Sequence, residues 1–299
     1  LPNAVVSRAF NQLGVPPPAL IDLDELVNES AQKLYGFQHD DGGWGWWFDD
    51  DSQPYQTAWV LFGLATMADA GHAIDPAVIE RGAAYLRDHM AEADPREQAY
   101  MLYSLAAAGA LLPEDGARAL ELLADSADAA PRTRAALDAF SLAALALALD
   151  AAGETAAAQA ALDRLEATAV VSGETAHWGV GRDGEYDRKV MASSTRSTAL
   201  ALSAFVKLRP GSELEPLLVN YLMAARRGDG WGTTNETAHA IIGLTDHLLA
   251  AGLGETTAAY TVTLNGAPLA EGALSTDELR DVVEVPFGRL QAGENGLTL

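Results

Sequence analysis

The chain has 299 residues, 49% of them hydrophobic, and a formal net charge of -23. Such an acidic surface repels phosphate backbones and anionic lipid, which argues against nucleic-acid binding and against adsorption to a membrane. The sequence contains no Cys, which excludes disulfides, thiolate zinc sites and cysteine nucleophiles within it. It also has no apolar run of the roughly 20 residues that a membrane span needs.

A repeated pair of helices is the main pattern along the chain. Residues 4–13 and 23–34 form the first predicted pair. In each later pair, an Ala/Leu-rich helix that is apolar nearly all round ends at a Gly or Pro and is followed by an amphipathic helix. These pairs are 54–64 with 76–90, 96–108 with 113–123, 132–152 with 154–165, 193–202 with 213–226, and a last one that opens at 233.

The difference between the two helices of a pair predicts the architecture. A helix that is apolar all round must be surrounded by protein, whereas an amphipathic helix faces water. About six such pairs in succession therefore predict a mainly α protein, an α/α toroid with the apolar helices inside. An open solenoid is the alternative, but solenoids usually bury one stripe on both helices. We expect the toroid to cover residues 1–254.

A change of pattern after Ala251 predicts β-structure in residues 255–299. Residues 259–268 alternate apolar and polar positions and contain the turn signal Asn265-Gly266. Residues 282–286 and 297–299 continue in the same style. Because three strands alone are marginally stable, we expect part of a β-sandwich whose other strands lie outside this sequence. The missing initial Met, and an end that falls inside the apolar alternating segment 296–299, fit a piece of a longer protein.

An aromatic and acidic loop is the most distinctive local feature. Trp44, Trp46 and Trp47 stand in a Gly-rich stretch, where they would stack on sugars or pack against a partner domain. The favoured interpretation is that they plug one end of the toroid, with indole N–H groups bonded to backbone carbonyls. The following residues 49–51 are all Asp, a sequence that suits Mg²⁺ or Ca²⁺. A solvated entry to the next helix is the preferred interpretation, because acids favour a helix N-terminus.

The remaining motifs do not indicate a nucleotide site, a metal site or a catalytic site. Residues 179–184 match Gly-x-Gly-x-x-Gly, but with no strand expected before them and no helix starting within them, a nucleotide site is not predicted. We expect a loop or small hairpin over 177–189. The six His have no metal-ligand spacing, and His239 is predicted to be a hydrogen-bonded core residue. The sequence thus predicts no catalytic residue, metal site or cofactor.

Several of these segments, in this order, resemble the thioester domain of bacterial alpha-2-macroglobulins. Residues 34–47 with 54–61 carry one match, and 228–238, with Gly230-Trp231-Gly232-Thr233, carry a second. Residues 1–10 resemble the helix that directly follows the family's Cys-Leu/Thr/Val-Glu-Gln thioester motif. The tail resembles the β-rich, CUB-like domain into which the family's helical domain is inserted.

The resemblance implies a protease trap. Such proteins offer a bait region, change shape on cleavage, and expose a thioester that captures the protease covalently, the helical domain acting as its shield. Because this chain lacks Cys, the motif would lie upstream of Leu1 or be missing. Residues 91–97 lack the His that complement relatives carry there, so a thioester would react directly with amines. The implied partners are the other domains of the parent chain and target proteases, with no nucleic acid or membrane contact, in the periplasm or at the cell surface, the parent being free or lipid-anchored.

Two alternatives remain beside a trap without catalytic activity. One is an enzyme such as a terpene cyclase, a prenyltransferase or a glycan-active enzyme, which share the double-ring fold. The other is a plain helical scaffold. Residues 49–51 do not supply the cyclase Asp-x-Asp-Asp spacing, and Gln53 interrupts Asp-Asp-x-x-Asp. The candidate residues for an interface or a structural loop are Trp44, Trp46, Trp47, Asp49, Asp50, Asp51, Tyr55 and Trp231.

Overall fold

The computed structural model describes residues 1–14, 22–127, 136–180, 184–252, 258–274 and 281–299. The chain divides into two compact units, Leu1–Ala250 and Ala251–Leu299. The first is helical apart from one short hairpin, and the second contains short antiparallel strands. The predicted class, mainly α with a short β-rich carboxyl-terminal segment, is confirmed. None of the described helices combines the length and apolarity that crossing a bilayer requires.

The helices begin close to the predicted positions because most of them start at a Pro or at a side-chain cap. Asp75, Asp94, Asp138 and Ser193 each accept a hydrogen bond from a backbone N–H of the helix that follows. In the described residues the helices are α1 (Pro2–Leu13), α2 (Leu23–Gly36), α3 (Pro54–Asp69), α4 (Pro76–His89), α5 (Pro95–Ala107), α6 (Pro113–Asp125), α7 (Ala139–Ala151), α8 (Thr155–Glu166), α9 (Gly184–Lys189), α10 (Ser194–Leu208), α11 (Leu214–Ala225) and α12 (Thr234–Ala251).

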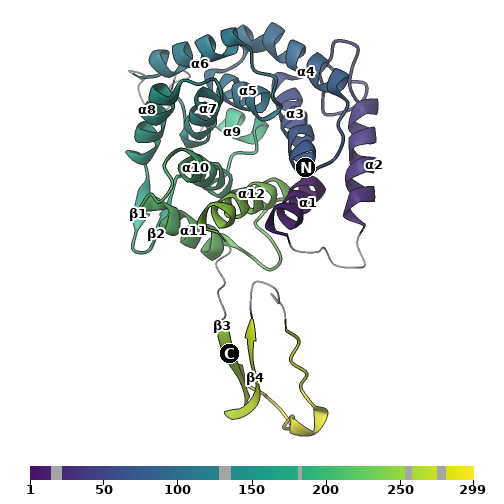
Figure 1. Cartoon of the computed structure of the whole chain (residues 1–299), viewed down its shortest axis with the longest axis vertical. Helices are drawn as coiled ribbons and strands as arrows, with labels where there is room; N and C mark the ends of the chain where they lie inside the picture. The colour runs from purple at the N-terminus through teal and green to yellow at the C-terminus, as the bar shows by residue number, and fades with distance from the viewer. Residues whose placement is uncertain (15–21, 128–135, 181–183, 253–257, 275–280) are drawn as a thin grey trace. The chain divides into compact units, whose positions relative to one another are not determined.

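The helices of the first unit lie in two layers around a ring (Figure 1). Helices α3, α5, α7, α10 and α12 lie inside, and α2, α4, α6, α8 and α11 lie outside. Burial follows the two sequence patterns. Inner helix α7 is buried without interruption from Phe140 to Leu149, whereas outer helix α8 buries only Ala158, Ala161, Leu162 and Leu165, one stripe at helical spacing.

Helix α12 connects the end of the ring to its beginning. A Cβ on Gly243 would lie 2.6 Å from the carbonyl oxygen of Ala199, so α12 and α10 approach as closely as two backbones can. On its other side, the ring of His239 lies 5.5 Å from that of Trp59 of α3, centre to centre, and Asp246 forms a 2.7 Å ion pair with Arg8 of α1. The first and last inner helices are therefore neighbours.

Two predictions about the connections are wrong in whole or in part. Helix α7 starts at Ala139 and not at 132, because the Asp138 carboxylate caps the amide of Ser141; residues 136–138 are not helical, and 128–135 lie outside the described residues. The loop or small hairpin expected over 177–189 is present only in part: the hairpin lies earlier, as β1 (Val170–Ser172) and β2 (Thr175–His177), residues 178–180 form a loop, and helix α9 occupies Gly184–Lys189. A strand thus precedes the Gly-x-Gly-x-x-Gly stretch and a short helix starts at its last Gly, contrary to our expectation.

The second unit is a three-stranded sheet in the order β4-β3-β5. Strands β3 (Ala258–Leu264) and β4 (Ala267–Leu274) pair through the predicted turn, in which Asn265 and Gly266 both have positive φ. Strand β5 (Leu297–Thr298) pairs with the end of β3. The strand predicted at 282–286 is wrong: this segment has no ladder partner in the described residues, and its final residue, Pro286, has no N–H to donate.

Candidate functional site

The first two turns of the inner helices meet around one buried cation. The side chain of Arg196, on the first turn of α10, is 1% exposed. Its guanidinium carbon lies 3.6 Å from the ring centre of Phe140, 5.6 Å from that of Tyr100, 5.8 Å from that of Tyr55 and 6.0 Å from that of Trp59. We call these four rings the Arg196 cage. Aromatic faces attract cations, which is how this site holds a charge away from water.

A backbone carbonyl fixes the cage from one side. The Arg196 Nη1 donates to the carbonyl oxygen of Val190 over 2.6 Å, and the Tyr55 hydroxyl donates to the same oxygen over 2.9 Å. Val190 directly follows α9. The short helix therefore places a carbonyl where it orients both the cation and one ring of the cage. No sequence pattern predicted this contact.

Buried polar atoms without a partner are concentrated at this end of the inner helices. Both amide atoms of Gln56 and of Asn235, the Tyr100 hydroxyl, and the Nε and Nη2 of Arg196 have no hydrogen-bond partner among the described residues. Gln56 and Asn235 lie one helical turn before Trp59 and His239, whose rings are in contact, and both stand at the N-terminal ends of their helices, α3 and α12. Because buried polar groups are ordinarily paired, this cluster has unused capacity to bind another group.

The ionisable groups in and beside the cage do not suit acid–base chemistry. Burial, assisted by the Arg196 charge, lowers the pKa of His239 to about 3, so its ring is neutral at physiological pH. Burial also raises the pKa of Tyr55 and of Tyr100, which keeps both hydroxyls protonated. The cavity beside Arg196 holds only about 10 Å³ of free space, about one water molecule.

A polar depression lies next to the cage. Glu97, which is buried, forms an ion pair of 2.5 Å with Lys189, and both line this depression together with His89. The ring of His89 stacks on Tyr85 at 4.1 Å. These residues come from α4, α5 and α9, and no spacing along the chain connects them, so the sequence gives no signal for them.

Three tryptophans fasten outer helices to inner helices in the same way. The indole of Trp44 donates to the Leu34 carbonyl of α2 over 2.8 Å, and its amide donates to Thr57 of α3 over 2.9 Å. Trp231 repeats this between α11 and α12, with Leu222 and Thr237 at 2.6 and 2.9 Å. We call this arrangement a tryptophan staple. The indole hydrogen bond to a carbonyl that the sequence predicted for Trp44 is present.

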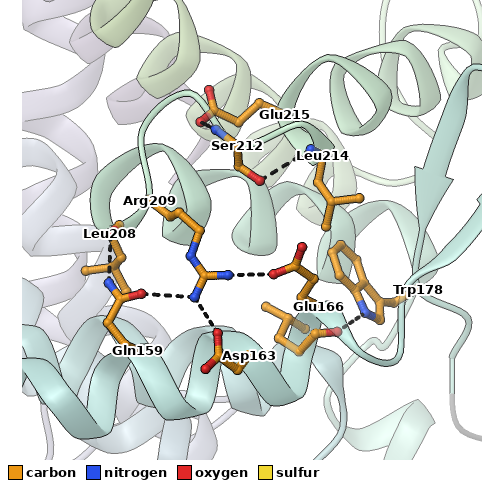
Figure 2. Close-up of polar contacts among 10 residues, drawn as sticks. Gln159, Asp163, Glu166, Trp178, Leu208, Arg209, Ser212, Leu214 and Glu215 are labelled. Atoms are coloured by element: carbon orange, nitrogen blue, oxygen red, sulfur yellow. Dashed lines mark hydrogen bonds and ion pairs between the residues drawn. The ribbon is translucent and has the colours of Figure 1, made fainter.

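Trp178, which was not among the candidate residues, forms a third tryptophan staple. The indole of Trp178 donates to the Leu165 carbonyl of α8 over 2.9 Å (Figure 2). The Trp178 amide donates to Thr198 of α10 over 3.4 Å. The shared signal is a Trp-Gly dipeptide between an outer and an inner helix, with a Thr in the inner helix. Arg209, after α10, bonds to Gln159, Asp163 and Glu166 on the same outer helix, as Figure 2 also shows.

The other candidate residues lie apart from the cage, except for Tyr55. Trp46 and Trp47 are 56% and 76% exposed, so they do not plug the ring. Asp49 and Asp51 are exposed, and the Asp50 carboxylate accepts a 2.8 Å hydrogen bond from the amide of Trp46. The first turn of α3 contains no acidic residue, so the expected helix entry is wrong too. No group of three or more potential metal ligands occurs among the described residues.

The chain is similar in sequence to a known protein. The chain is 26% identical over 223 residues to an alpha-2-macroglobulin of Thermotoga maritima, a match that covers 75% of this chain and 12% of that protein. No protein-family model matches the chain. This chain therefore corresponds to a small part of its relative's length.

Solved structures with the same fold belong to the same group of proteins. Native Escherichia coli alpha-2-macroglobulin, from domain MG7 to its C-terminus, superposes with a TM-score of 0.65 at 17% identity over 93% of this chain and 44% of that one. Salmonella alpha-2-macroglobulin reacted with methylamine gives 0.65 at 18% identity, over 93% of this chain and 19% of that one. By sequence and by fold, this chain is similar to the bacterial alpha-2-macroglobulins.

Proposed function

We propose that this chain is the thioester-type domain of a longer alpha-2-macroglobulin-like protease trap, and that it shields a thioester carried by residues before Leu1. The observation that carries the proposal is the cluster of unpartnered atoms on Gln56, Asn235, Tyr100 and Arg196. A buried cluster of donors and acceptors suits a segment of polypeptide that docks on it and brings its own amides and carbonyls.

The direction of α1 supports the proposal that residues before Leu1 dock on this cluster of unpartnered atoms. Asn11, near the end of α1, donates to the carbonyl of Ala70 at the end of α3 over 2.7 Å. The two helices therefore run in the same direction, and the start of α1 lies toward the start of α3, where Tyr55 and Gln56 are. Leu1 packs against the same core cluster as the cage.

In this proposal the chain acts without turnover. Its partners are the other domains of the parent and the proteases that the parent captures, and the parent works in the periplasm or outside the cell, free or lipid-anchored. Escherichia coli alpha-2-macroglobulin has been solved after activation by porcine elastase and by trypsin, which supports proteases as partners here.

The experiment is a thiol assay on the parent protein that contains this chain. Methylamine should release one thiol per molecule and become attached to a Gln, as measured with a thiol reagent and by mass spectrometry. Absence of a Cys, or a thiol that is free before methylamine is added, would instead mean a relative that traps without a thioester, and the shielding proposal would fail.

A pair of variants tests the shield itself. Replacing both Gln56 and Asn235 by Leu should let water hydrolyse the thioester, so that the thiol is free before methylamine is added. Gln159→Leu is the matched control, since the Gln159 amide bonds to the carbonyl of Leu208 at a distant surface. Equal thiol release in the double variant and the control would contradict the proposed role of the cluster.

A further inference from the structure

Four aromatic side chains form an exposed patch on the loop between α2 and α3. Trp46, Trp47 and Phe48 are consecutive and are 56%, 76% and 61% exposed, and Phe37 is 46% exposed. The rings of Phe37 and Phe48 meet edge to face with centres 5.8 Å apart. We call these four residues the aromatic patch. Large aromatic rings held in water are characteristic of binding surfaces, where Trp contributes more than most residues.

The loop is fixed in place by its own hydrogen bonds. The Asp50 carboxylate accepts from the amide of Trp46 over 2.8 Å, and a Cβ on Gly45 would collide with that carboxylate, so only Gly fits there. On the other side, the Ser52 hydroxyl donates to Asp41 over 2.8 Å and bonds to the ring of His39. Because the loop is already ordered, a partner would lose little conformational entropy in binding it.

The charge around the aromatic patch indicates what it binds. Five aspartates lie within this loop: Asp40, Asp41, Asp49, Asp50 and Asp51. Among the described hydrogen bonds, the cationic side chain that bonds to this loop is that of Arg81, which donates to Gln38. Aromatic faces attract cations, and carboxylates beside them strengthen the attraction. A cationic partner would also relieve the repulsion among the aspartates.

The same charge disfavours the other occupants. A second copy of this chain also carries a net charge of -23 and would be repelled, as would an anionic lipid surface. A neutral glycan could stack on the rings but would leave the aspartates unneutralised. We propose that the aromatic patch docks a protein segment bearing Arg or Lys side chains. This inference does not depend on the thioester.

Calorimetric titration of the chain with a synthetic peptide of alternating arginine and serine tests the proposal. The neutral probes are a peptide of alternating glutamine and serine and a chitin oligosaccharide. We expect saturable binding of the arginine peptide that weakens with salt, and none of either neutral probe. Binding of the oligosaccharide but not of the arginine peptide, or binding of neither, would overturn the proposal.

Matched variants separate this site from general attraction to an acidic protein. The double variants Trp46→Ser with Trp47→Ser and Asp49→Asn with Asp51→Asn should each weaken binding roughly tenfold or more. The controls are Asp88→Asn with Asp125→Asn, exposed acids on α4 and α6, and Val170→Ser with Val171→Ser, exposed apolar residues of β1. Equal weakening by the control pairs would mean non-specific attraction and would overturn the proposal.

Discussion

Replacing Arg196 by Met should make the helical unit more stable, although it removes several contacts. A buried charge costs several kcal/mol of solvation, and it is a stabilising feature only where its partners compensate for that loss. Arg196 is 1% exposed, and two of its three nitrogens have no hydrogen-bond partner among the described residues. Met fills most of the same volume without a charge.

The magnitude follows from the contacts of the Arg196 cage. The bond from Nη1 to the Val190 carbonyl and the attraction to the rings stabilise the fold by about 2 kcal/mol each. Burial of the ion, with two unpaired donors, costs somewhat more than these two contributions together. The Val190 carbonyl keeps its bond from Tyr55, so the substitution leaves no acceptor unpaired. We expect the free energy of unfolding to rise by about 1 kcal/mol.

Urea unfolding followed by tryptophan fluorescence measures this change. All 6 Trp lie between residues 44 and 231, so the signal reports the helical unit alone. Arg164→Met is the matched control, because its guanidinium bonds to the carbonyls of Leu123 and Ser126, both at 3.0 Å, and its loss should cost about 1–3 kcal/mol. A loss of more than about 1 kcal/mol in Arg196→Met would refute the reasoning and show that the charge is compensated.

Three further predictions concern single contacts. Because the pKa of His239 is about 3 in the folded chain, against an ordinary value of 6.5, the unfolded chain binds a proton that the folded chain does not between these values. The stability that the neutral His239 contributes is therefore lost as the pH falls below 6.5, by about 1.4 kcal/mol per pH unit. Between pH 7 and pH 5.5, the free energy of unfolding should fall less in His239→Leu than in the native chain. Trp178→Phe should lower the unfolding free energy by about 0.5–1.5 kcal/mol, because it removes the indole hydrogen bond to the Leu165 carbonyl, which keeps its bond from the Thr168 hydroxyl; an unchanged urea midpoint would contradict this. Gly243→Ala should cost about 1–3 kcal/mol, since the new Cβ meets the Ala199 carbonyl, whereas Gly63→Ala, with nothing within 4 Å, should be neutral or stabilising; similar melting temperatures for the two would count against the close approach of α10 and α12.

The sequence predicts most of the helices well, because each of these carries its own signal. Pro54, Pro76, Pro95 and Pro113 stand at helix starts, where Pro is tolerated, and apolar periodicity separates inner from outer helices. The tight turn at Asn265-Gly266 is predictable for the same reason, since few residues accept positive φ.

The site is less predictable because its contacts join distant parts of the chain. Arg196 is in an apolar helix, but no local rule says that a cation there will be buried among rings from α3, α5 and α7. Trp46 and Trp47 stand in the same Gly-rich stretch as Trp44, so the sequence does not distinguish the three. The structure shows that Trp44 is buried, whereas Trp46 and Trp47 are exposed. The segment 282–286 alternates like a strand, but a strand requires a partner edge as well as a pattern.

The tryptophan staples divide the ring into two kinds of junction. Those from α2 to α3, α8 to α10 and α11 to α12 each carry a staple, and α12 joins the two ends of this series through Arg8 and Trp59. In the described residues, the junctions from α4 to α5 and from α6 to α7 carry none. There, Arg87 of α4 bonds to Asp115 of α6, and Arg118 of α6 bonds to Gln98 of α5. The stapled junctions bond through neutral groups, so they should keep their geometry over a wider range of salt concentration than the charged contacts of the arc from α4 to α7.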